Sequence, residues 1–189
     1  MIVVLAGRRI DAPDAKVRRF PPGLAGLVKQ RLIDSLKSVV ATHLVSSGAC
    51  GADLLAMEAA SELKIDRTMI LPFDATTFRS TSVTDRPGDW GMIYDKFIQE
   101  LKPDKLITLG YDQNDPEVYE RTNFEILDYA EKIAEKINAT PPAQKNTVPG
   151  KLALIVWEGK PKDADDTTYH FLKEAQKRNF KIREIRILE

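Results

Sequence analysis

Short runs of apolar, often β-branched residues recur along the chain, and longer segments with helical spacing lie between them. Such runs are typical of strands that are covered on both faces of a sheet. They occupy residues 1–6, 43–46, 68–72, 105–109, 152–157 and 181–188. Apolar residues follow helical intervals over residues 24–39, 54–63, 90–101 and 117–137, and a further helix starts near residues 166–168. This alternation predicts an α/β fold: a doubly wound, mostly parallel six-stranded sheet with helices on both faces.

Two polar segments interrupt the alternation. The stretch from Asp74 to Asp89 is too long for an ordinary connection, and long loops in compact domains are usually lids or binding loops. We therefore expect Phe78 to Asp89 to form a lid. Residues 138–150 are rich in proline and polar residues, which indicates a linker or surface excursion. Because only one strand–helix–strand unit follows, too small to fold alone, we predict a single domain over residues 1–189 with this linker inside it.

The stretch from Ser47 to Asp53 combines a strand ending, a turn with two glycines and a helix start. The first N–H groups of a helix have no partners inside the helix, and the helix dipole is positive there. This turn is therefore a candidate cradle for an anion or a polyol. The alternative is that Gly48 and Gly51 merely close a short connection between strand and helix.

Ligands of open parallel sheets bind beyond the carboxyl ends of the strands. In this chain the loops at that edge start at residues 7, 47, 73, 110 and 157. We therefore expect one site at this edge. The residues that it gathers are Arg8, Arg9, Ser47, Gly48, Asp53, Ser80, Ser82 and Glu158.

Charge and composition narrow the classes of partner. The 28 basic residues equal the 28 acidic residues in number, which argues against a dedicated binder of nucleic acids or anionic membranes. No apolar run approaches the roughly 20 residues that span a bilayer, and no signal-like segment opens the chain. Cys50 is the one cysteine, so an internal disulfide is impossible. We expect a soluble cytoplasmic protein with no membrane partner.

Several motifs together resemble the SLOG superfamily. The most specific is Ser47-Gly-Ala-Cys-Gly-Ala-Asp53 in its strand–turn–helix context. The others are Gly7-Arg-Arg-Ile-Asp11, Leu71-Pro-Phe73, Phe78 with Ser82-Val83, Trp90 with Tyr94, Tyr119 and Asn123 with Ile126-Leu127 and Ala130, and Val156-Trp-Glu-Gly159 with Thr167-Thr168. The chain is most similar to the stand-alone SLOG proteins of the YpsA-like type, and the resemblance covers nearly its whole length.

The resemblance implies a Rossmann-like fold that binds a nucleotide, a nucleotide derivative or a phospho-sugar, and it implies self-association into a homo-oligomer. Combined with the sheet-edge argument, it predicts a ligand-binding set: Gly7, Arg8, Arg9, Ser47, Gly48, Ala49, Cys50, Gly51, Asp53, Phe73, Ser80, Ser82, Asn123, Trp157, Glu158, Gly159, Thr167 and Thr168. The leading functional hypothesis is a nucleotide-derivative binding protein that acts as a sensor, a carrier or a sequestering protein.

Two further functions stay open at this point. The LOG members of the superfamily cleave nucleoside monophosphates at the N-glycosidic bond with a Pro-Gly-Gly-x-Gly-Thr-x-x-Glu signature. The corresponding stretch, Lys160 to His170, lacks the glycine pair and the glutamate. An N-glycosidase would have to use other groups, of which Arg9, Glu58 and His170 are the candidates. A DprA-like binder of single-stranded DNA is a third hypothesis, but it needs a basic groove with stacking aromatic side chains.

Each candidate near the first two strand ends also has a structural interpretation. Arg8 and Arg9 either clamp a phosphate or form salt bridges with a neighbouring helix. Asp53 either caps its helix or binds a ribose hydroxyl. Glu58 is either a partner of one of these arginines or a general base. Cys50 is either reactive, with a lowered pKa, or a small residue that fills a turn.

The later candidates have similar alternatives. His170 is either an acid–base group or an exposed helix residue. The aromatic side chains of Trp157, Trp90, Tyr94 and Phe73 are candidates for stacking on a base, although the spacing of Trp90 and Tyr94 fits a core position equally well. The acidic residues Asp163, Asp165 and Asp166 are candidates for a Mg²⁺ site. Their alternative is a solvated loop that ends in an aspartate helix cap.

Overall fold

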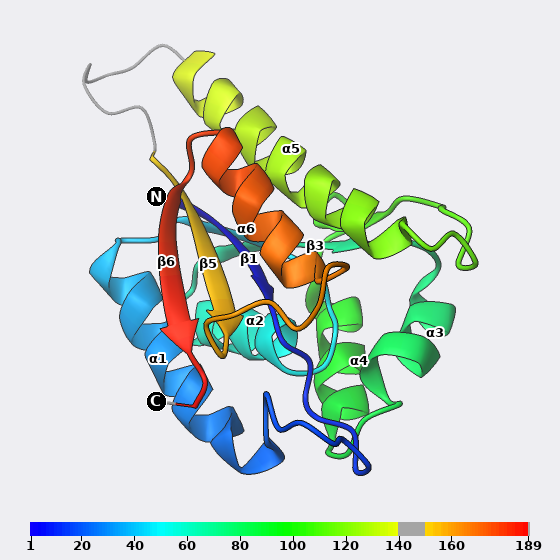
Figure 1. Cartoon of the computed structure of the whole chain (residues 1–189). Helices are drawn as coiled ribbons and strands as arrows, with labels where there is room; N and C mark the ends of the chain where they lie inside the picture. The colour runs from blue at the N-terminus through cyan, green and yellow to red at the C-terminus, as the bar shows by residue number, and fades with distance from the viewer. Residues whose placement is uncertain (140–149, 189) are drawn as a thin grey trace.

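The computed structural model describes residues 1–139 and 150–188. Its six strands form one sheet in which every neighbouring pair is parallel. They are β1 (Ile2–Gly7), β2 (His43–Ser46), β3 (Asp66–Leu71), β4 (Leu106–Thr108), β5 (Lys151–Trp157) and β6 (Lys181–Arg186). The predicted α/β fold with a doubly wound six-stranded sheet is confirmed, and the sheet is parallel throughout (Figure 1).

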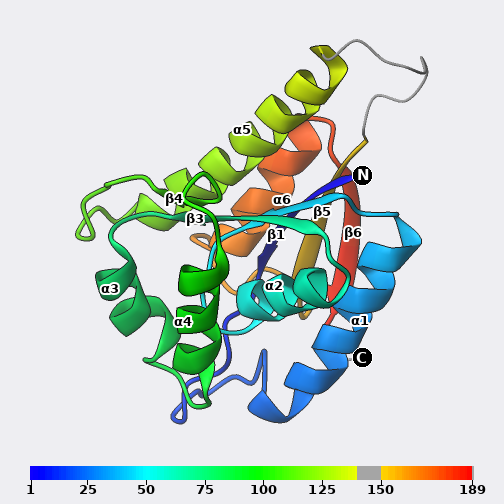
Figure 2. The same ribbon diagram turned by 180° about the vertical axis from the view of Figure 1, so that it is seen from behind.

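Helices cover both faces of this sheet. They are α1 (Ala25–Ser38), α2 (Ala52–Glu62), α3 (Ala75–Phe78), α4 (Trp90–Glu100), α5 (Val118–Ala139) and α6 (Thr167–Lys177), with a 3₁₀ turn η1 (Pro22–Leu24) before α1. Helices α5 and α6 pack on one face, and α1, α2 and α4 lie on the other, as Figures 1 and 2 show from opposite sides. The sheet is therefore the middle of three layers.

The central strand β1 contributes to both hydrophobic cores. Val3 and Leu5 pack in the core beneath α1, α2 and α4, whereas Ile2, Val4 and Ala6 pack in the core beneath α5 and α6. Successive side chains of a strand point to opposite faces, so a strand covered on both sides must be apolar at every position. This requirement explains why the run of residues 1–6 is continuously apolar rather than alternating.

The strand order β4-β3-β2-β1-β5-β6 places a topological switch between β1 and β5. From β1 the chain proceeds strand by strand to β4 at one edge, and it then returns to lay β5 on the other side of β1. The loops that leave β1 and β5 therefore diverge to opposite faces. A crevice opens at such a point beyond the carboxyl ends of the strands, which is where doubly wound sheets bind ligands.

The segment expected to be a lid is largely helical. Asp74 caps α3 by accepting a hydrogen bond from the Thr77 N–H at 2.9 Å. A π-helical turn, η2 (Arg79–Val83), follows and is closed by the hydrogen bond from the Thr84 N–H to the Arg79 carbonyl at 2.9 Å. Phe78 is buried in the core, as are the last two residues of η2. The prediction of a lid from residue 78 is therefore wrong for residues 78–83, because they are packed structure.

The first two residues of the predicted linker are helical. Asn138 and Ala139 belong to the last turn of α5, and residues 140–149 lie outside the described residues. Within residues 1–139 and 150–188, none of the helices has the length and apolar character needed to cross a membrane.

Candidate functional site

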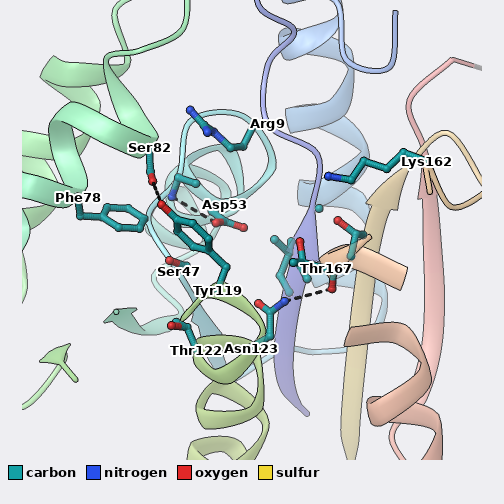
Figure 3. Close-up of a pocket in the computed structure, with 15 residues that line it drawn as sticks. Arg9, Ser47, Asp53, Phe78, Ser82, Tyr119, Thr122, Asn123, Lys162 and Thr167 are labelled. Carbon is teal, nitrogen blue, oxygen red and sulfur yellow. Dashed lines mark hydrogen bonds between the residues drawn. The ribbon is translucent and has the colours of Figure 1, made fainter. Parts of the chain in front are cut away.

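A pocket of about 240 Å³ lies beyond the carboxyl end of β1, at the switch point of the sheet (Figure 3). Five separate segments supply its walls, and each comes from the edge at which the sequence places the site. The lining residues are Leu5, Ala6, Gly7, Arg9, Ser47, Ala49, Asp53, Phe78, Ser82, Tyr119, Thr122, Asn123, Lys162, Thr167 and Thr168.

The pocket has a cationic end and a polar, uncharged end. Figure 3 shows Arg9 and Lys162 at one end and Thr122 and Asn123 at the other, with Tyr119 between them. The Lys162 side chain is exposed, and it forms no hydrogen bond or ion pair within residues 1–139 and 150–188. One end of the pocket is therefore suited to an anion and the other to hydroxyl or carbonyl groups.

Two glycines bring the helix α2 against the loop after β1. Gly51 has a positive φ of 95°, and a Cβ there would lie 2.7 Å from the Arg8 carbonyl oxygen. A Cβ on Gly7 would lie 2.5 Å from the Cβ of Ala52. Both positions require glycine for close backbone approach. Gly51 therefore serves to close the connection between β2 and α2, which was the alternative to ligand binding.

The backbone donors of the Ser47–Asp53 turn are largely used within the protein. The Ala49 N–H donates to Asp53 Oδ2 at 3.2 Å, and the Cys50 N–H donates to the Ser82 carbonyl at 3.0 Å. The Ala52 N–H donates to the Arg8 carbonyl at 3.1 Å. The predicted backbone cradle is therefore closed at these three groups, and side chains must supply most of the polar contacts in the pocket.

Asp53 is the one carboxyl among the pocket residues. It lies in the first turn of α2, where the helix begins, and only 9% of the residue is exposed. Burial raises its pKa from 3.8 to about 7, because the desolvated carboxylate is costly. The hydrogen bond from the Ala49 N–H opposes this shift without cancelling it. Near neutral pH, Asp53 is therefore present both as a donor and as an acceptor.

Arg9 lines the pocket and is only partly occupied by protein contacts. One of its terminal nitrogens, Nη2, pairs with Asp85. Its Nε is buried and has no hydrogen-bond partner within the described chain. Of the two adjacent arginines, this is the one that the pocket can use.

Arg8 is turned away from the pocket, contrary to the prediction that it clamps a phosphate there. Its Nε donates to Glu158 Oε2 at 2.6 Å, its Nη1 to Asp166 Oδ1 at 2.7 Å and its Nη2 to the Lys160 carbonyl at 3.0 Å. Only 6% of Arg8 is exposed. Arg8 therefore fastens the loop after β1 to the loop after β5, and Glu158 is its partner rather than a pocket residue.

Asp166 completes this network as the N-cap of α6. Its Oδ1 accepts hydrogen bonds from the N–H groups of Thr168 and Tyr169. Burial opposes ionisation of this carboxyl, but the hydrogen bonds from Arg8 and from the Lys162 N–H outweigh burial and lower its pKa. The predicted aspartate helix cap is confirmed, and it differs from α2, whose N-cap residue Gly51 makes no side-chain hydrogen bond.

The catalytic candidates Glu58 and His170 do not line the pocket. Glu58 lies five residues after Asp53, about 140° around the helix, and its Oε1 is 3.5 Å from Lys29 Nζ of α1. It is not a partner of Arg8 or Arg9 and has no place as a general base in the pocket. His170 Nδ1 lies 3.1 Å from Glu120 Oε1, and Nε2 lies 2.8 Å from the Ala164 carbonyl. His170 therefore links α6 to α5.

The expected base-stacking aromatics are core residues. Trp157 is 3% exposed, stacks on Tyr169 and donates from Nε1 to Glu184 Oε2 at 2.9 Å. Phe73 is buried against Phe78 and Tyr119. Trp90 and Tyr94 are also buried, which is the core interpretation of their spacing.

Four other predicted ligand residues lie outside the pocket lining. Gly48 packs against Met69 and Tyr94, and Gly159 lies beneath the side chain of Arg186. The Ser80 hydroxyl is exposed and donates to the Thr77 carbonyl. Cys50 is fully buried, and burial raises the pKa of its thiol, so it fills the turn rather than acting as a reactive group.

The predicted Mg²⁺ candidates do not converge. Asp163 and Asp165 lie on an exposed loop, where the Asp165 N–H donates to Asp163 Oδ1 at 3.1 Å, and the carboxylate of Asp166 is occupied as described. Nowhere in residues 1–139 and 150–188 do three or more metal-ligating side chains form a group that could hold a metal ion.

Several pocket residues were not in the predicted set. Leu5, Ala6, Phe78, Tyr119, Thr122 and Lys162 are the lining residues that the set omits. The helical spacing of Tyr119, Thr122 and Asn123 is a usable signal, because residues three and four apart share one face. The Tyr119 hydroxyl also lies 3.1 Å from the Ser82 hydroxyl.

Comparison with known proteins yields no match for this chain, either among protein-family models or among curated proteins.

Proposed function

We propose that this protein binds a nucleotide or a nucleotide-derived small molecule in the pocket at the switch point of its sheet. The observation that carries the proposal is the division of the pocket into a cationic end with Arg9 and Lys162 and a polar end with Thr122 and Asn123. A phosphate fits the first end, and sugar hydroxyls fit the second.

Asp53 and the aromatic wall extend this assignment. An ionised Asp53 accepts hydrogen bonds from ribose hydroxyls, and its place between the two ends matches the position of a sugar next to a phosphate. Tyr119 lines the pocket from α5, is 42% exposed and offers a surface for a base, and the buried Phe78 lies beside it in the pocket wall. The Ser47–Asp53 motif, which resembles that of SLOG proteins, supports the same ligand class, and so does the position beyond the parallel strands.

The test is a thermal-shift panel of nucleoside monophosphates, cyclic nucleotides, ADP-ribose and ribose 5-phosphate. A ligand that binds only the folded state raises the Tm in proportion to the logarithm of its concentration above Kd. At least one compound is expected to do so, and Lys162→Ala is expected to weaken its effect. Lys160→Ala is the matched control, because Lys160 is an exposed lysine of the same loop that does not line the pocket. If no compound of the panel raises the Tm, the proposal is wrong.

A second candidate function is hydrolysis of the N-glycosidic bond of a nucleoside monophosphate, and Asp53 favours it. A carboxyl with a pKa of about 7 inside a polar pocket is a suitable general acid. In that reaction the oxygen of water bonds to the anomeric carbon as the carbon–nitrogen bond breaks, and the departing base takes a proton from Asp53. The proton that the added water then loses returns the Asp53 carboxylate to its acid form. Chromatography after incubation with each monophosphate is expected to show free base with the wild type and none with Asp53→Asn. Absence of base release by the wild type excludes this activity and leaves the binding proposal intact.

A further inference from the structure

A second cavity, here called the arginine cavity, adjoins the pocket. Its volume is about 330 Å³, and it shares Gly7, Arg9, Lys162, Thr167 and Thr168 with the pocket. Its other lining residues are Arg8, Ile10, Asp11, Ala12, Ala15, Val17, Arg19 and Arg86. Because Arg9 and Lys162 line both spaces, a molecule that places an anion between them can extend into either.

The arginine cavity is strongly basic. Its lining contains four arginines and Lys162 but a single acidic residue, Asp11. The Asp11 carboxylate accepts hydrogen bonds from the backbone N–H groups of Arg19 and Phe20, so it holds its own loop together. Arg8 is neutralised by its two carboxylate partners, and Arg19 Nε lies 3.0 Å from Glu158 Oε1. Of the remaining cations, Arg9 and Lys162 line both spaces and Arg86 lines the arginine cavity alone.

A carboxylate already lies between two of these cations. Asp85 pairs through Oδ1 with Arg9 Nη2, and its Oδ2 lies 3.9 Å from Arg86 Nε. The Nε atoms of Arg9 and Arg86 are nevertheless buried without a hydrogen-bond partner in the part of the chain that the structure describes. Two buried guanidinium donors that lack acceptors are unfavourable, and a phosphate provides more acceptor oxygens than one carboxylate.

We infer that the ligand carries at least two linked phosphates, as in a nucleoside diphosphate or a related pyrophosphate compound. The first phosphate lies between Arg9 and Lys162, and the second enters the arginine cavity, where it meets Arg86 and displaces Asp85 from Arg9. The volume of the pocket supports this inference. By itself the pocket, at about 240 Å³, is smaller than the range of about 300–1,000 Å³ that is usual for ligand sites. The inference rests on the proposed function for the base and the ribose.

The experiment compares nucleoside monophosphates, nucleoside diphosphates and inorganic pyrophosphate by isothermal titration calorimetry. The variants are Arg86→Ala, which removes a cavity cation, Asp85→Asn, which removes the internal competitor, and Lys160→Ala as the control. A diphosphate is expected to bind at least about tenfold more tightly than the matching monophosphate. Arg86→Ala should abolish this advantage while the monophosphate affinity stays the same, and Asp85→Asn should raise the diphosphate affinity.

The outcomes separate the inference from the proposed function. If a monophosphate binds but the diphosphate gains nothing, or the gain survives Arg86→Ala, the inference is overturned and the proposed function stands. If no nucleotide binds but pyrophosphate binds in an Arg86-dependent way, the pyrophosphate site stands and the nucleotide assignment falls. If none of the three probes binds, both are overturned.

Discussion

The substitution Asp53→Asn tests the assignment of Asp53 as a carboxyl that stays protonated up to neutral pH in the folded protein. In the unfolded chain this group ionises near its ordinary pKa of 3.8, whereas burial in the folded protein raises the pKa to about 7. Between these values the folded state holds a proton that the unfolded state has lost. Raising the pH through this window therefore favours unfolding, and the full penalty is present above pH 7.

The size of the effect follows from the shift. A change in pKa from 3.8 to about 7 corresponds to at most about 4 kcal/mol of stability, and about 2–3 kcal/mol of it falls between pH 5 and pH 8.5. An asparagine retains an oxygen that can accept the hydrogen bond from the Ala49 N–H, and it does not ionise. The wild type is therefore expected to lose about 2–3 kcal/mol more than the variant over this range.

Urea denaturation of both proteins at the two pH values provides the measurement. Other titrating groups contribute equally to both proteins, so the difference between the profiles isolates Asp53. Asp163→Asn is the control, since this aspartate lies on an exposed loop and its profile should run parallel to that of the wild type. Parallel profiles for the wild type and Asp53→Asn would refute the raised pKa.

Three further predictions concern the surroundings of the pocket. Arg8→Met should destabilise the protein by about 3–5 kcal/mol, because it leaves the buried Asp166 carboxylate without its cation. Arg19→Met should cost about 1 kcal/mol or less in the same urea titration. Gly7→Ala should cost about 1–3 kcal/mol through overpacking, while Gly23→Ala, which meets nothing within 4 Å, should be nearly neutral by the same thermal or chemical assay. Glu58→Gln should leave the ligand affinity measured by calorimetry unchanged. A clear loss of affinity would show that Glu58 takes part in binding.

The strands and the long helices could be predicted because their patterns are local. Each buried strand is a continuous apolar run, and each long helix repeats its apolar face. The short α3 and η2 could not be predicted in this way, because their conformation depends on distant partners. The Ser82 carbonyl accepts a hydrogen bond from the Cys50 N–H, and the Ser82 hydroxyl lies against that of Tyr119.

The convergence of the loops followed from topology, but the direction of individual side chains did not. Arg8 and Arg9 are adjacent, and their roles differ because Glu158 and Asp166, about 150 residues away in sequence, capture Arg8. The position of Trp157 could have been predicted, because side chains alternate between the two faces of a strand. Trp157 shares a face of β5 with Ala153 and Ile155, which belong to the core beneath α5 and α6 rather than to the pocket.

Several N–H groups at the N-termini of α2 and α6 donate to protein acceptors, so we propose that side chains supply most of the recognition of an anion. Before and at the start of α2, the N–H groups of Ala49, Cys50 and Ala52 donate to protein acceptors. In α6 the N–H groups of Thr168 and Tyr169 donate to the Asp166 cap. The dipoles of these helices therefore act on a ligand only at a distance. What remains at the sheet edge is Arg9 and Lys162, which come from loops on either side of the switch point. The proposed ligand is thus held by two separately anchored cations, and the Arg8 network sets the distance between their loops.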